Sequence, residues 1–99
     1  MIIVRNVFQA KYGKGGELVA LFKEFRQKFP PKYGFPGFRL FTDLSGPFFT
    51  IVSEAEVPSL AEWEKINTQI FADPDFGGWF ARMQPLVESG QREFYNVVE

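Results

Sequence analysis

The sequence contains no cysteine and no histidine, and these two absences exclude whole classes of function. A chain without cysteine forms no disulfide, and it offers neither a thiolate nucleophile nor a thiolate metal ligand. A chain without histidine has no imidazole base, no Ser-His-Asp triad and no histidine-ligated zinc or haem. We therefore expect neither a metal site nor a cofactor, and the sequence identifies no catalytic residue.

The chain also lacks an excess of charge of either sign, because its 11 Lys and Arg residues nearly balance its 12 Asp and Glu residues. The cations are spread along one predicted helix and at loop edges, so the basic stripe of a nucleic-acid-binding domain is absent. No apolar run approaches the ~20 residues that span a bilayer, and residues 1–5 are too short for a signal peptide. We expect a cytoplasmic protein that binds neither nucleic acid nor a membrane.

Aromatic residues are present in excess: 13 Phe, 3 Tyr and 2 Trp make up 18% of the 99 residues. A chain of this length forms one domain, here residues 1–99, and is too short for two. Aromatic side chains dominate cores and interfaces, and the core of one small domain does not hold so many. We expect some of them to line a pocket or a subunit contact.

Hydrophobic periodicity predicts a strand, a helix and two further strands in the first part of the chain. Residues 2–10 are rich in β-branched types and contain neither Gly nor Pro, which is typical of a strand. Apolar residues at steps of three and four predict a helix over 17–29, which Pro30-Pro31 ends. Residues 38–44 and 48–57 are two further predicted strands, joined by a tight hairpin turn.

The second part of the chain predicts a broken helix and a last strand. A Ser-Leu-Ala-Glu capping box at 59–62 marks the helix start. The helix breaks and restarts at Asp73, the expected N-cap, followed by Pro74 at the first helical position. Because Gly77-Gly78 weakens a helix interior, the restarted segment is expected to be short, bent or closely approached. Ser-Gly at 89–90 is expected to end this segment, and residues 91–98 form the last predicted strand.

The resulting order, β-α-β-β-α-β, is that of the ferredoxin-like α+β fold. Right-handed crossovers place both helices on one face of a four-stranded antiparallel sheet. The strands nevertheless read as apolar on both sides; in the first strand Val4 and Phe8 oppose Ile3 and Val7. A sheet with one wet face shows clean alternation of apolar and polar residues.

Exposing about five such side chains forgoes roughly 7–15 kcal/mol, at ~1.5–3 kcal/mol each. This is comparable to the whole stability of a typical domain, ~5–15 kcal/mol. The expected solution is a second copy packed sheet to sheet. We therefore predict an obligate two-fold homodimer, and leave open whether dimers assemble further.

Four segments carry a resemblance to a known family: Lys-Tyr-Gly-Lys at 11–14, Ser-Leu-Ala-Glu-Trp at 59–63, Ala-Asp-Pro-Asp-Phe at 72–76 and Gly-Gln-Arg-Glu-Phe-Tyr at 90–95. With the opening strand, they resemble the dimeric α+β barrel superfamily, in particular its NIPSNAP-like and antibiotic-biosynthesis-monooxygenase-like branches. The resemblance covers nearly the whole chain. It implies an eight-stranded barrel built from two subunits, with a pocket between sheet and helices in each.

Members of this superfamily differ in activity. Some are cofactor-free oxygenases of aromatic or polyketide-like substrates, some degrade haem, and many have no known activity. The haem-degrading members use an Asn on the first strand, a Trp at the start of the second helix and a His further along it. Asn6 and Trp63 fall at the first two positions, but the His position falls near Phe80. That form of haem ligation is therefore not available to this chain.

The resemblance implies a pocket for a small apolar or aromatic molecule. Six residues are candidates to line it: Asn6, Phe8, Trp63, Trp79, Phe80 and Tyr95. The Asn6 amide would hold a ligand oxygen, or equally a backbone group, because a buried amide needs partners either way. Ordinary core packing is the favoured alternative for Trp63 and for the Trp79–Phe80 pair.

Charged strand residues have a structural interpretation. Arg5 and Arg39 are placed to reach a dimer seam or a pocket rim. We favour cross-strand ion pairs for them instead, with Asp43, Glu54 or Glu93 as partners.

Two functions stay open. In the first, the protein is a cofactor-independent monooxygenase, in which the pocket orients an electron-rich substrate and stabilises its oxyanion. Asn6, Trp63 and Tyr95 would be the donors there. In the second, the protein is a non-catalytic homodimeric ligand-binding or stress-related barrel. This second function needs only the apolar pocket and the sheet-to-sheet contact between the two copies.

Overall fold

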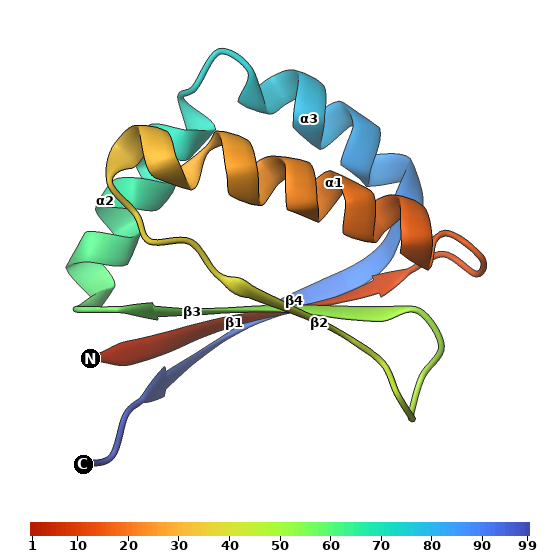
Figure 1. The fold of residues 1–99 in the computed structure, drawn as a ribbon, viewed down its shortest axis with the longest axis horizontal. Coiled ribbons are helices and arrows are strands. Elements are labelled where there is room, and N and C mark those ends of the chain that lie inside the picture. The colour runs from red at the N-terminus through yellow and green to blue at the C-terminus, as the bar shows by residue number, and fades with distance from the viewer.

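A four-stranded antiparallel sheet carries all the helices on one of its faces (Figure 1). The computed structural model describes all residues, 1–99. The strands lie in the order β2-β3-β1-β4, which with the chain order confirms the predicted ferredoxin-like fold. Their bounds are Ile2–Ala10 for β1, Arg39–Thr42 for β2, Thr50–Val57 for β3 and Val87–Asn96 for β4.

The helical layer contains three α-helices, where the sequence predicted two with a break in the second. These are α1 (Gly15–Lys28), α2 (Leu60–Phe71) and α3 (Phe76–Met83), with short 3₁₀ helices η1 (Pro30–Tyr33) and η2 (Gln84–Leu86). The predicted cap at the start of α2 is present, since the Ser59 hydroxyl accepts from the Glu62 backbone N–H at 3.2 Å.

The predicted helix cap at Asp73 is wrong, because α3 begins only at Phe76 and its N-cap residue is Asp75. The Asp73 carboxylate instead holds the turn before the helix. It accepts from the Tyr33 hydroxyl at 2.7 Å, from Lys32 Nζ at 3.0 Å and from the Asp75 backbone N–H at 2.8 Å. These bonds, the one from the Asp75 N–H foremost, lower the pKa of Asp73 to about 2 and tie η1 to the α2–α3 connection.

The observed strands differ from the prediction at both ends of β2, at the start of β3 and at both ends of β4. β2 ends at Thr42, so the connection to β3 is a longer loop, in which the Thr50 N–H donates to Asp43 Oδ1 and Phe49 adopts a positive φ of 60°. β4 starts at Val87 rather than at 91. The Ser-Gly pair read as the end of the helix lies inside this strand, where Gly90 pairs with Phe8.

The core lies between the sheet and the helices. On each strand, the core side chains are the alternate residues that point toward the helices. The helical side chains of the core point back toward the sheet. The most deeply buried apolar residues are Val4, Ala10, Ile51 and Val57 from the strands and Leu18, Phe22, Phe29, Ile70 and Trp79 from the helical layer.

The opposite face of the sheet is left uncovered (Figure 1). The register places side chains there in rows that cross the strands. One row is apolar on three strands, with Phe41, Val52 and Val7, and ends at Gln91 on β4. The next row alternates in charge across all four strands. From β2 to β4 the members of that charged row are Arg39, Glu54, Arg5 and Glu93.

The expectation of two apolar faces is therefore only half correct, because charged residues share the second face. The cross-strand ion pairing favoured for Arg5 is confirmed: Arg5 Nη2 lies 2.9 Å from Glu54 Oε2. The same expectation for Arg39 is wrong, because Arg39 forms no ion pair and its guanidinium lies 5.1 Å from the centroid of the Phe41 ring. No helix combines the length and the hydropathy that crossing a bilayer requires.

Candidate functional site

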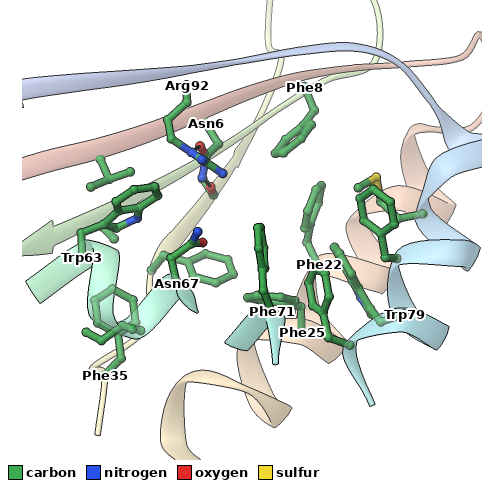
Figure 2. Close-up of a pocket in the computed structure, with 18 residues that line it drawn as sticks. Asn6, Phe8, Phe22, Phe25, Phe35, Trp63, Asn67, Phe71, Trp79 and Arg92 are labelled. Atoms are coloured by element: carbon green, nitrogen blue, oxygen red, sulfur yellow. Dashed lines mark hydrogen bonds between the residues drawn. The ribbon is translucent and has the colours of Figure 1, made fainter. Parts of the chain in front are cut away.

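A cavity of about 260 Å³ lies between the sheet and the helices (Figure 2). β1, β3 and β4 form one side, α1, α2 and α3 form the other, and the segment before β2 contributes Phe35 and Phe38. Of its 18 lining residues, 14 are hydrophobic. A cavity of this size and character suits a small apolar molecule.

The α1–α3 side of the cavity is an aromatic wall. The Trp79 ring lies 4.8 Å from Phe25, 5.7 Å from Phe22 and 5.9 Å from Phe76, between ring centroids. The Trp79 indole N–H donates to the backbone carbonyl of Leu21 at 2.8 Å. Because that donor is occupied, Trp79 presents only its apolar surface to a ligand.

The other end of the cavity is polar, and the sheet register creates it. Asn6 lies directly across from Ser53 on β3 and from Arg92 on β4. Asn6 Nδ2 donates to the Ser53 hydroxyl at 3.2 Å, and Arg92 Nε donates to Asn6 Oδ1 at 2.8 Å. Asn6 is thus held from both sides, which fixes the orientation of its amide.

Arg92 is the charged member of this polar end. Its guanidinium carbon lies 4.8 Å from the centroid of the Trp63 ring. None of the ion pairs in the structure includes Arg92. The side chain keeps contact with solvent, and the partial desolvation of its guanidinium lowers the pKa of Arg92.

Two further donors face the same end. Figure 2 shows Trp63 and Asn67 on α2 beside Arg92 and Asn6, with Phe71 between them and the aromatic wall. The Trp63 ring packs edge-on against Phe94 at 5.0 Å. Neither the Trp63 indole N–H nor the Asn67 amide donates a hydrogen bond within the protein, so both donors are open to a ligand.

Five of the six predicted pocket residues line this cavity: Asn6, Phe8, Trp63, Trp79 and Phe80. Tyr95 does not. It pairs with Ile3 on the uncovered face of the sheet, where the Arg5 guanidinium lies 5.7 Å from its ring. The neighbouring Glu93 carboxylate raises the pKa of Tyr95, so the phenol stays protonated.

Sequence reasoning missed Arg92 and Asn67 as lining residues. Arg92 stands inside one of the motifs that carried the family resemblance, but nothing in the motif tells which way it points. Its place two residues from Phe94 and two from Gly90 puts the three on one face of a strand, but this spacing does not tell whether that face meets the helices. Gly90 has a steric role there, because a Cβ atom would lie 3.0 Å from the Phe8 ring.

The mouth of the cavity is formed by exposed aromatic residues of α2 and α3. Phe71 is 56% exposed and Phe80 is 39% exposed, although both line the cavity. Gly77 and Gly78 lie at the start of α3, and no other part of the chain comes within 4 Å of a Cβ atom built on either. The helix that contains this glycine pair is short, as predicted, with 8 residues. The alternative prediction, that another segment packs closely against the glycines, is wrong.

No group of three or more acidic side chains is placed to hold a metal ion. Scans against protein-family models and against curated proteins find no match. Solved structures, by contrast, match along the whole chain and define the class of fold.

The chain has the α+β fold of NIPSNAP-domain and antibiotic biosynthesis monooxygenase proteins, which confirms the resemblance at the level of the fold. A NIPSNAP domain protein from Burkholderia xenovorans superposes with a TM-score of 0.84 and 18% identity, over 99% of this chain and 95% of that one. A NIPSNAP family protein from Agrobacterium tumefaciens gives 0.87 and 16%, over 99% and 93%. An antibiotic biosynthesis monooxygenase gives 0.74 and 18%, over the full length of both chains.

Proposed function

We propose that the protein is a homodimeric binding protein for a small, mainly aromatic molecule held between the sheet and the helices. The observation that carries this proposal is the cavity of about 260 Å³, whose lining is hydrophobic at 14 of 18 positions. An apolar cavity of about 150 Å³ is enough to bind benzene, so this one has room for a larger ring system. Ring-on-ring contact with the aromatic wall adds to the affinity for such a ligand.

The uncovered sheet face supports the homodimer. Val7, Val52 and Phe41 form an apolar row there, and Phe41 is 38% exposed in the single chain. The adjoining charged row carries two Arg and two Glu residues, so it is neutral as a whole.

A second copy related by a two-fold axis parallel to the strands reverses the direction of this row. Each positive residue then faces a negative one, and the face is buried without like charges in opposition. We keep the cytoplasmic location as part of the proposal, because the absence of cysteine fits a reducing compartment.

A cofactor-independent monooxygenase is the second candidate, and a specific observation bears on it. The donors at the polar end suit an oxyanion of the substrate, as such chemistry needs. The four polar lining residues, Asn6, Ser53, Asn67 and Arg92, nevertheless include no group that acts as a base near neutral pH. Only a substrate that ionises without help, such as an acidic quinol, would react with dioxygen there.

Native mass spectrometry of freshly purified protein tests the proposed function. We expect a dimer mass and, in a fraction of the molecules, an added small molecule that organic solvent extracts. Naphthalene, titrated into protein after that extraction, is expected to bind and to quench tryptophan fluorescence. A protein that carries no molecule and does not bind naphthalene contradicts the proposal. Dioxygen uptake with hydroxylated anthrones or quinols separates the second candidate from the first.

A further inference from the structure

We infer that the molecule bound in the cavity carries a carboxylate at one end of an aromatic body, and that Arg92 binds this carboxylate. The inference rests on the proposed binding role of the cavity and names the class of ligand. It starts from a cation that lines a mostly hydrophobic cavity and has no counter-ion. Arg5 and Arg82, by contrast, both have a glutamate partner.

The geometry around Arg92 favours a planar, two-oxygen group. Its Nε atom is taken by Asn6 Oδ1, which in turn fixes the plane of the guanidinium. The two terminal nitrogens remain free of protein partners. A carboxylate accepts two parallel bonds from such a fork, which a single hydroxyl or carbonyl oxygen does not do.

The surroundings of Arg92 strengthen this preference. The Trp63 ring, 4.8 Å from the guanidinium carbon, covers one side of the cation and removes water from it. Charge-assisted hydrogen bonds are stronger in such a partly desolvated site than at an open surface. The Asn67 amide and the Trp63 indole N–H, both without protein partners, offer further donors to the same oxygens (Figure 2).

The rest of the cavity sets the size of the body. Phe8, Phe22 and Phe71 lie between the polar end and Trp79 (Figure 2). Because about 150 Å³ holds one benzene ring, the 260 Å³ here suits two fused rings with a small head group. Arylcarboxylates of the naphthoate type combine this body with this head.

A matched pair of probes tests the inference on the intact protein by calorimetric titration at pH 7. The acid, 2-naphthoate, is ionised there, and 2-naphthamide has the same shape without the charge. We expect 2-naphthoate to bind wild-type protein at least about tenfold more tightly than 2-naphthamide. In Arg92→Gln we expect the affinity for 2-naphthoate to fall at least about tenfold, with the affinity for 2-naphthamide changed less than about threefold.

Arg82→Gln is the control, because Arg82 pairs with Glu24 on the outer surface and does not line the cavity. It is expected to change neither affinity. Equal affinities for the acid and the amide in wild-type protein would overturn the inference while leaving the aromatic cavity intact. Equal losses for both probes in Arg92→Gln would also overturn it, because Arg92 would then act through packing. Failure of naphthalene as well as both probes to bind is a different result, which removes the proposed function itself.

Discussion

The two faces of the sheet use alternate residues of the same strands for different purposes. On β1, Val4, Asn6 and Phe8 point toward the helices and contribute to the core or the cavity. Their neighbours Arg5 and Val7 point to the uncovered face, in rows that cross the sheet. The helix face is completed within one chain, whereas the uncovered face has apolar residues that one chain leaves half-exposed. Because successive side chains of a strand point to opposite faces, the position of a substitution along the strand decides which face it affects.

The largest effect is expected on the helix face, from Trp79→Ala. Trp79 is 5% exposed and contacts several rings of the aromatic wall. Its truncation is expected to destabilise the protein by about 3–5 kcal/mol, as is typical for a buried large aromatic residue. Urea unfolding measures this loss. Trp79→Phe keeps one aromatic ring and loses the hydrogen bond to Leu21 and part of the indole volume. Its loss of stability is expected to be smaller, and a loss as large as that of the alanine variant would contradict the packing account.

The next largest effect is expected on the uncovered face, from Val52→Asp. Val52 lies in the apolar row between Phe41 and Val7, so the new carboxylate would be buried without a partner in the proposed dimer. We expect the dissociation constant of the dimer to rise at least about 100-fold, measured by analytical ultracentrifugation over a dilution series. Val98→Asp makes the same change at a residue 93% exposed and is the control. A dimer equally weakened by both variants would argue against this face as the interface.

A smaller effect separates binding from stability. In Gly90→Ala the new methyl group would meet the Phe8 ring at about 3.0 Å, so the ring must shift into the cavity. We expect naphthalene affinity to fall about 3–10-fold, with a change in stability below about 1 kcal/mol, because overpacking and reduced chain entropy oppose each other. Titration and urea unfolding measure the two quantities.

Gly16→Ala is the control for that experiment, since nothing lies within 4 Å of its new methyl group. It is expected to stabilise α1 by about 0.5–1 kcal/mol and to leave naphthalene binding unchanged. Unchanged binding in Gly90→Ala would show that Phe8 does not limit the space available to the ligand.

The smallest effect is confined to acid and to the helical layer. Because the folded-state pKa of Asp73 is lowered from 3.8 to about 2, its stabilising contribution is fully present above about pH 4 and is lost as the pH falls toward 2. Asp73→Asn should therefore be less stable than wild type at neutral pH and should lose less stability between pH 4 and pH 2. Urea midpoints across this range measure the difference.

Asp75→Asn is the matched control, because the Asp75 side chain is 52% exposed against 2% for Asp73. Its effect at neutral pH is expected to be smaller. The dimer dissociation constant should be unchanged in both variants, since neither residue lies on the sheet. A steeper acid loss in Asp73→Asn than in wild type would contradict the role given to this carboxylate.

Local signals in the sequence were sufficient for the order of elements. The apolar stripe ahead of Pro30, the capping box at Ser59 and the break near Asp73 all depend on neighbours within one turn of helix. The start of β4 was missed because Ser89 and Gly90 are also typical helix terminators. In the sheet, Gly90 instead makes room for a ring from the adjacent strand, a contact between residues far apart in sequence.

The candidate site was only partly predictable for a related reason. Alternation groups Tyr95 with Glu93, and Arg92 with Phe94, but it does not tell which group meets the helices. That choice is set by the pairing of β4 with β1, which places Arg92 opposite Asn6 and Tyr95 opposite Ile3. Register is a property of the assembled sheet and is not encoded in any short segment. For this reason the sequence prediction placed Tyr95 in the cavity and omitted Arg92.

The central claim is that one face of the sheet lines the ligand cavity while the other packs against a second copy of the chain. Sedimentation equilibrium of the wild-type protein at micromolar concentration tests this claim most directly. The proposed dimer predicts a single species of twice 11.4 kDa that persists on dilution through the micromolar range. A well-folded species of 11.4 kDa, with the row of Phe41, Val52 and Val7 exposed to water, would contradict it.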